Sequence, residues 1–253
     1  MLIDINTYLG HWPFRQLRHN TIEGLLRLMD SNGIDRAVTA SIHGMFYKNV
    51  LPANEEVAHE TGPHRDRILP YAVINPVDAD WEEDLRRSAE ELELTGLRLF
   101  PQYHGYHLTD PAALELIDAA TELGWPIQVP MRVVDRRQRH PWDQAHDLIA
   151  ADFERALAAR PAARWMILDS LGLDGARLPE NASYLVEISR MTAVLQRNIQ
   201  AFMETAGANH LAFGTGMPFK MPAPTLLKLK MLDQPEGVRE GIAWRNAETL
   251  LSG

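Results

Sequence analysis

Residues 96–131 read GLRLFPQYHGYHLTDPAALELIDAATELGWPIQVPM, and this stretch decides the fold class. The apolar runs at 96–100 and 127–131 predict two buried strands. Between them, residues 111–123 have the composition of an amphipathic helix, with Asp110 as its expected N-cap. A strand, a helix and a second strand in this order predict one unit of a parallel sheet.

The same alternation continues in both directions along the chain. Further strands are predicted at 2–6, 37–41, 68–74, 165–169, 184–189 and 210–215, and further helices at 21–32, 52–64, 80–92, 143–159, 194–205, 224–232 and 235–251. Eight strand–helix units predict a single (β/α)8 TIM barrel over residues 1–253, with extra C-terminal helices. An open doubly wound sheet is the alternative, but Asn6 to Gly10 do not form its glycine-rich phosphate turn.

Composition limits the classes of partner. The chain has 253 residues, no cysteine and a formal net charge of -9. An acidic surface argues against nucleic acid, because phosphate contacts need clustered Lys and Arg. The lack of cysteine excludes a thiol nucleophile and a Cys-ligated zinc site. The first ten residues do not resemble a signal peptide, and no apolar run approaches the roughly 18 residues of a membrane helix. We therefore expect a cytoplasmic protein without a membrane partner.

Polar residues at the predicted strand ends are the candidates for function, since active sites of such barrels lie there. The expected proton-transfer residues are His11, His104 and Asp169, and the expected substrate-binding residues are Asn6, Tyr8, Arg98, Gln128, Arg132 and Ser170. Histidine titrates near neutral pH, and a buried carboxyl group has a shifted pKa. Arginine binds carboxylates through two hydrogen bonds, which predicts a small anionic ligand.

Each candidate also has a purely structural interpretation. Arg98 could face outward or pair with a carboxylate such as Asp169 or Glu187. His11 could belong to a packed lid or an oligomer contact. The basic residues between 132 and 140 could form a solvated loop.

Six stretches, in chain order, resemble the amidohydrolase superfamily, in particular the amidohydrolase-related branch of small hydrolases and decarboxylases of aromatic and related acids. They are IDINTYLG at 3–10, GLRLFPQYHGYHLTDP at 96–111, ELGWPIQVP at 122–130, ILDSLG at 167–172, LAFGTGMPF at 211–219 and REGIAWRNAETLL at 239–251. The resemblance implies the barrel fold, a site at the strand ends and a homo-oligomer.

The resemblance also implies where a metal would bind, and those positions carry unsuitable residues. Members of the family that bind a metal use two histidines of the first strand, and these positions hold Asn6 and Tyr8 here. The family's histidines on the fifth and sixth strands correspond to Pro130 and Ser170, and its aspartate on the eighth strand corresponds to Gly216. Pro and Gly side chains have no lone pair to donate, and neutral Asn, Tyr and Ser are poor zinc ligands. We therefore predict no metal and no other cofactor.

Three functions remain open on the sequence. The first is a metal-independent hydrolase or lyase that acts on a small anionic organic molecule. The second is a non-catalytic ligand-binding or scaffolding protein derived from the enzyme fold. The third is a hydrolase with a displaced metal site, for which His104 and His107 are the candidate pair.

Overall fold

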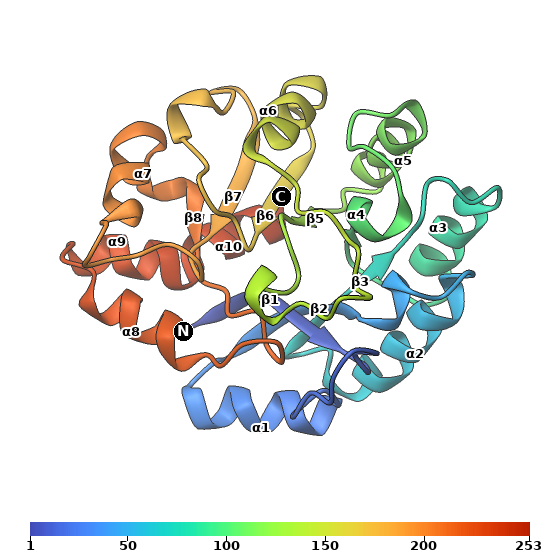
Figure 1. Ribbon diagram of the computed structural model, residues 1–253. Coiled ribbons are helices and arrows are strands. Elements are labelled where there is room, and N and C mark those ends of the chain that lie inside the picture. Colours follow the sequence, from blue (N-terminus) through green and yellow to red (C-terminus); the bar gives the residue numbers. More distant parts are fainter.

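Eight parallel strands follow one another around a barrel in the computed structural model, which describes residues 1–253 (Figure 1). They are β1 (Ile3–Leu9), β2 (Arg36–Ser41), β3 (Ile68–Val73), β4 (Leu97–Arg98), β5 (Ile127–Pro130), β6 (Arg164–Leu168), β7 (Ser183–Glu187) and β8 (Leu211–Ala212). The barrel closes where the Ile5 N–H donates to Phe213 O at 3.1 Å and Thr7 forms a parallel bridge with Met217. Because spatial order follows chain order, the predicted (β/α)8 barrel is confirmed and the doubly wound sheet is excluded.

The helices surround the strands (Figure 1). They are α1 (Ile22–Asn32), α2 (Leu51–Thr61), α3 (Trp81–Glu90), α4 (Pro101–His104), α5 (Pro111–Glu122), α6 (Ala150–Ala159), α7 (Asn198–Ala206), α8 (Ala223–Met231), α9 (Glu236–Glu240) and α10 (Asn246–Ser252). A π-helical segment, Gly241–Arg245, joins α9 to α10. None of these helices combines the length and apolar character needed to cross a membrane.

Helix α1 shows how local sequence sets the element boundaries. The Thr21 side chain accepts a hydrogen bond from the Gly24 N–H at 3.2 Å and so caps the first turn. Gly33 ends the helix in the left-handed conformation, with φ +65°, which glycine adopts without steric cost. Leu25 and Met29 lie on the buried face and join the main apolar core between helices and strands.

The structure corrects the starts of two predicted helices. The helix expected from residue 143 begins only at Ala150, because the carboxylate of Asp147 accepts from Arg136 and Arg139 and holds the preceding segment as a loop. The helix expected from residue 194 begins at Asn198. No helix was predicted between β6 and β7, and the structure has only a 3-10 turn there, Gly175–Arg177.

Hydrogen bonds cross the barrel interior from β4 and β5 to β1. Arg98 donates to Thr7 O and to Gln128 Oε1, both at 2.7 Å, and Gln128 Nε2 donates to Ile5 O at 2.7 Å. Arg98 and Gln128 are both fully buried. Arg98 therefore neither faces outward nor pairs with a carboxylate, so both structural interpretations offered for it are wrong.

Candidate active site

A pocket of about 330 Å³ lies at the carboxyl ends of the strands. Loops after β1, β5, β7 and β8 line it, and its residues are Arg15, Val133, Val134, Asp135, Gln138, Arg190, Phe219, Lys220 and Met221. The loop after β5 crosses in front of the strands (Figure 1). Gln138 in this loop accepts from Arg15 at 3.1 Å, and Asp135 accepts from Arg190 at 3.2 Å. These contacts hold the loop over the barrel mouth.

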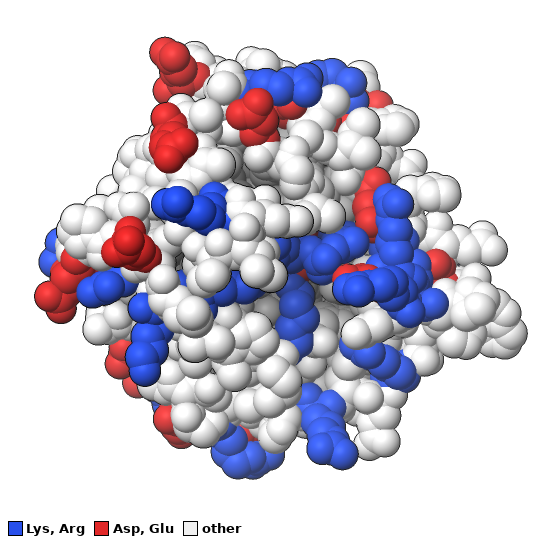
Figure 2. All heavy atoms as spheres, turned by 60° about the vertical axis from the view of Figure 1, so that its left-hand side comes forward, with Lys and Arg blue, Asp and Glu red and all other residues white.

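The pocket lining is basic, although the chain as a whole is acidic. Three cationic side chains, Arg15, Arg190 and Lys220, share the lining with one carboxylate, Asp135. Figure 2 shows Lys and Arg side chains gathered across the hollowed middle of one face of the molecule. Converging positive charge of this kind raises the local concentration of small anions.

Lys220 reaches from the loop after β8 to the end of β6. Its ammonium group donates to Asp169 Oδ1 and, at 2.8 Å, to Ser189 Oγ. The side chain of Asp169 is 2% exposed and that of Lys220 is 28% exposed. A charged group on the mouth side is therefore anchored by a buried carboxylate beneath it.

A network of polar side chains supports Asp169 from the other strands. Asn6 Nδ2 donates at 3.2 Å to both Asp169 Oδ2 and Glu187 Oε2. Glu187 in turn accepts the backbone N–H groups of Asp169, at 2.8 Å, and Ser189, at 2.7 Å. Since β1 does not adjoin β6 or β7, the Asn6 bonds span the barrel and fix the two carboxylates relative to each other.

The electrostatics of this network favour a charged lysine. Burial raises the pKa of Asp169, and the Lys220 ammonium acts against that effect. Burial works to lower the pKa of Lys220, but the carboxylates of Asp169 and Glu187 outweigh it and raise that pKa above its ordinary value. Asp169 also has a φ of +53°, a left-handed conformation that is uncommon for non-glycine residues, although aspartate adopts it more readily than most.

Several buried polar atoms at the mouth have no partner within the protein. They are Asn6 Oδ1, Tyr8 Oη, Ser170 Oγ, Arg132 Nε and Arg190 Nε. A buried polar group left without a hydrogen bond costs about 1–3 kcal/mol, so such groups usually meet a ligand or water. Four of the predicted substrate-binding residues, Asn6, Tyr8, Arg132 and Ser170, thus retain free hydrogen-bonding capacity at the mouth.

The two predicted catalytic histidines lie apart from Asp169, and no hydrogen bond or ion pair joins them to it. His11 is exposed at the rim, where its backbone N–H donates to His43 Nε2 at 2.8 Å. His104 is in α4, where its Nε2 bonds to Gly44 O at 2.9 Å and its ring packs near Phe100. Arg132 forms long ion pairs, at 3.7 and 3.8 Å, with Asp135 and Asp147.

The model of the amidohydrolase family matches residues 9–164, which is 156 of 253 residues and more than half of the chain. The chain belongs to the amidohydrolase family. No functionally curated protein matches it in sequence. The predicted superfamily is therefore confirmed, whereas the activity has to be inferred from the site.

Solved structures of similar fold include decarboxylases of aromatic acids. One is 2,6-dihydroxybenzoate decarboxylase from Rhizobium, with a TM-score of 0.75, 15% identity and coverage of 99% of this chain and 98% of that chain. Another is 5-carboxyvanillate decarboxylase from Sphingomonas paucimobilis, with a TM-score of 0.74, 15% identity and the same coverage. A third is dihydroxybenzoic acid decarboxylase from Polaromonas sp. JS666 with bound manganese and the inhibitor 2-nitroresorcinol, with a TM-score of 0.74, 14% identity and coverage of 99% and 96%. At these identities the likeness establishes the fold alone.

The residues at the mouth of this amidohydrolase barrel do not fit a metal ion. No group of three or more His, Asp or Glu side chains is placed to hold one. Two carboxylates meet here: Asp169 already pairs with the Lys220 ammonium, and both Asp169 and Glu187 accept from the Asn6 amide. A divalent cation at Asp169 would lie against this ammonium, and like charges at such a distance repel strongly in a buried site.

Sequence reasoning missed Lys220, which is the cation of this site. The stretch that resembles the family at this point, LAFGTGMPF at 211–219, stops one residue short of it. Arg190 was missed as well. A lysine in a loop carries no local pattern that distinguishes a pocket residue from a surface residue, so only the three-dimensional contact with Asp169 reveals it.

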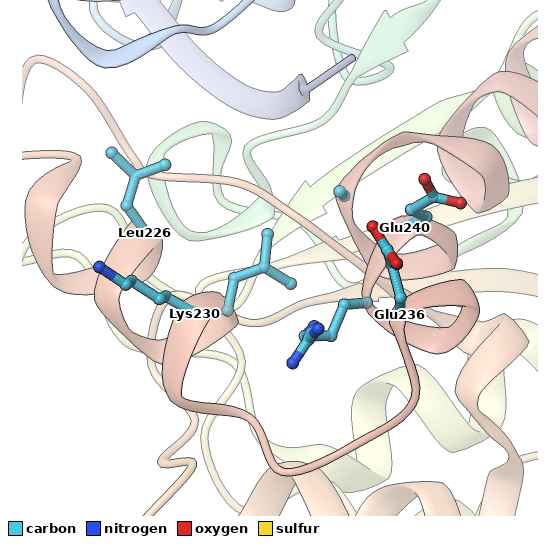
Figure 3. Close-up of a pocket in the computed structure, with 7 residues that line it drawn as sticks. Leu226, Lys230, Glu236 and Glu240 are labelled. Carbon is cyan, nitrogen blue, oxygen red and sulfur yellow. The ribbon is translucent and has the colours of Figure 1, made fainter.

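A second hollow, of about 410 Å³, lies on the outside of the barrel between α8 and α9. Figure 3 shows Leu226 and Lys230 on one side of it and Glu236 and Glu240 on the other. None of the strand-end candidates lines this hollow. Its residues therefore suit control substitutions, because they lie outside the candidate site.

Proposed function

We propose that this amidohydrolase-family barrel is a metal-independent lyase or hydrolase that acts on a small anionic organic molecule. The observation that carries the proposal is the mouth pocket, which is lined by Arg15, Arg190 and Lys220, the last of them paired with the buried Asp169. Its volume of about 330 Å³ suits a small organic acid. The structural relatives named as decarboxylases of dihydroxybenzoates support an aromatic acid as the first substrate to try.

Asp169 is the residue that we assign to proton transfer. It is buried, and its two oxygens are bonded to Lys220 and Asn6, so the Lys220–Asp169 pair can hold or release one proton at the pocket floor. His11 and His104 are not joined to this pair. Arg98 and Gln128 are fully buried and bond to each other, so we assign them to barrel stability and leave substrate contact to the mouth residues.

A panel of small aromatic and aliphatic carboxylates, incubated with chelator-dialysed protein, tests the proposal. The products are followed by release of CO2 and by separation of hydrolysis products. We expect turnover of at least one acid without added metal, and a loss of at least tenfold in kcat in the variant Asp169→Asn. Turnover that needs a divalent metal, or that is unchanged in Asp169→Asn, would contradict the proposal.

A non-catalytic binding protein is the second candidate. The specific observation in its favour is that both oxygens of Asp169 are already engaged, which leaves no free general base at the mouth. This candidate predicts that the same panel contains a ligand that binds and is not consumed.

A further inference from the structure

Lys220 places a fixed positive charge at the carboxyl ends of β6 and β7. Its ammonium contacts Asp169 and Ser189, which follow β6 and β7, while its own backbone follows β8. A Cβ atom at Gly216 would come within 2.7 Å of Lys220 Cε. The lysine side chain therefore fills the space that any larger residue at position 216 would occupy.

The ammonium retains capacity for one further acceptor. An ammonium group has three N–H donors, and the protein uses two of them, on Asp169 and Ser189. The side chain is 28% exposed and belongs to the lining of the mouth pocket. The third donor is thus available to a ligand that enters this pocket.

Arg190 adds a second cationic donor to the same pocket. Its Nη2 donates to Asp135 at 3.2 Å, whereas its Nε is buried and has no partner in the protein. Both Arg190 and Lys220 line the pocket, and no carboxylate other than Asp135 does so. The lining therefore combines an excess of positive charge with unused N–H groups, which is what a carboxylate ligand requires.

We infer that Lys220 and Arg190 together bind the carboxylate of the substrate, and that Lys220 supplies at the barrel mouth the positive charge that a metal ion would otherwise provide. The inference rests on the proposed function and extends it by naming two residues and the group that they recognise. It also accounts for glycine at position 216, since an aspartate there would collide with the lysine side chain.

The contact between Lys220 and Ser189 could instead indicate a serine nucleophile with a lysine base. That arrangement needs a neutral amine that can accept the Ser189 proton. Asp169 contacts the ammonium directly and Glu187 lies close behind it, so the pair of carboxylates keeps the lysine protonated. The geometry therefore supports a fixed cation, and Ser189 serves as its hydrogen-bond acceptor.

Calorimetric titration of chelator-dialysed protein with benzoate and with the neutral benzamide tests the inference. We expect benzoate to bind at least tenfold more tightly than benzamide. The variants Lys220→Met and Arg190→Met should each weaken benzoate binding at least tenfold and leave benzamide binding nearly unchanged. The matched control is Lys230→Met, which removes the same charge from the outer hollow between α8 and α9 and should leave benzoate binding as it is. Ser189→Ala should change benzoate binding less than threefold.

Lys220→Met alone leaves the buried carboxylate of Asp169 without its partner. The double variant Lys220→Met/Asp169→Asn replaces both charged groups by neutral groups of similar size. Circular dichroism checks that the double variant folds. A folded double variant that binds benzoate as the wild type does would overturn the inference. Retention of one transition metal per chain after chelator dialysis would overturn it as well. Benzoate binding that depends on Lys220, without turnover of any acid in the panel, would contradict the proposed enzyme and still support the inference.

Discussion

Gly216 and Lys220 occupy one space: a Cβ atom at Gly216 would lie 2.7 Å from Cε and 3.1 Å from Nζ of Lys220. The backbone at Gly216 has a φ of +77°, so a side chain there is disfavoured by the backbone conformation as well as by the contact. The absence of a side chain at Gly216 and the position of the Lys220 ammonium are therefore two parts of a single arrangement, and a change at Gly216 should act through Lys220.

This relationship predicts the effect of Gly216→Ala. The left-handed backbone conformation alone costs about 1–2 kcal/mol for an alanine. In addition, the methyl group should push the flexible end of Lys220 away from Asp169 and leave that carboxylate without its cation. We expect Gly216→Ala to lower the free energy of unfolding clearly more than this backbone cost and to weaken carboxylate binding, as measured by urea denaturation and calorimetry.

Gly33→Ala is the matched control for this prediction. Gly33 has a similar φ of +65° at the end of α1, and no atom lies within 4 Å of an added Cβ there. This variant should show the backbone cost alone and normal ligand binding. Equal losses of unfolding free energy in Gly216→Ala and Gly33→Ala would mean that the contact between residue 216 and Lys220 contributes nothing to stability.

The fold was predictable because it depends on patterns repeated along the whole chain. Alternating apolar runs and amphipathic segments locate all eight strands, and glycine at position 33 correctly ends α1. The errors fall where tertiary contacts decide. Asp147 is bound by arginines of its own loop, so the residues before Ala150 cannot continue the helix that their composition favours.

The site was predictable only in part, for a related reason. Asn6 ends the predicted first strand and lies within β1, and Asp169 and Ser170 directly follow β6. Active sites of such barrels lie at the carboxyl ends of the strands, so these residues could be predicted. Lys220 lies eight residues beyond the last residue of β8, and its position depends on how the loop folds back over Asp169. His104 follows a strand too, but α4 turns it toward Gly44. Homo-oligomerisation and a cytoplasmic location stay predictions from the sequence.

The hydrogen bonds between the buried side chains of Arg98 and Gln128 lead us to expect a definite order of stability among three variants. Gln128→Leu removes the oxygen that accepts two N–H groups of the Arg98 guanidinium. The buried charge of Arg98 then lacks this acceptor, which should lower the free energy of unfolding by about 3–5 kcal/mol. Arg98→Met removes the charge itself and leaves only the neutral Gln128 and Thr7 acceptors unsatisfied, at about 1–3 kcal/mol. The double variant should be no less stable than Gln128→Leu. Urea denaturation checks the order, and the reverse order would contradict the view that Gln128 serves to hold Arg98.

Because the ring of His104 is largely buried, we expect the folded protein to lose stability in mild acid. Burial lowers its pKa below the ordinary value of 6.5, so the ring is neutral in the folded protein and its Nε2 hydrogen donates to Gly44 O. The unfolded chain takes up a proton at a higher pH than the folded one, so stability falls as the pH drops below 6.5 toward the folded pKa. The variant His104→Gln keeps an N–H donor and does not titrate, so its stability should fall less over this range. Imidazole resonances in an NMR titration give the pKa directly, and a midpoint above 6.5 would contradict the prediction.

The buried carboxyl group of Asp4 should make the stability of the protein depend on pH with the opposite sign. Its carboxyl group is fully buried beneath the mouth, where it bonds to the Thr215 hydroxyl at 2.6 Å and to the backbone N–H groups of Asn6 and Thr215. Burial raises the pKa of Asp4 from 3.8 to about 7 despite these bonds. The folded protein therefore keeps a proton that the unfolded chain loses above pH 3.8, and stability declines as the pH rises from about 4 to 7.

At about 1.4 kcal/mol per pKa unit, the contribution of Asp4 to this decline is on the order of 4 kcal/mol. Asp4→Asn mimics the protonated carboxyl group in shape, and the Thr215 hydroxyl can turn to accept from its amide. We expect this variant to match the wild type in stability near pH 4 and to exceed it near pH 7, with urea denaturation at both values as the measurement. A variant that is less stable than the wild type at pH 7 would show that Asp4 is ionised in the fold and that its three donors, not burial, dominate its energetics.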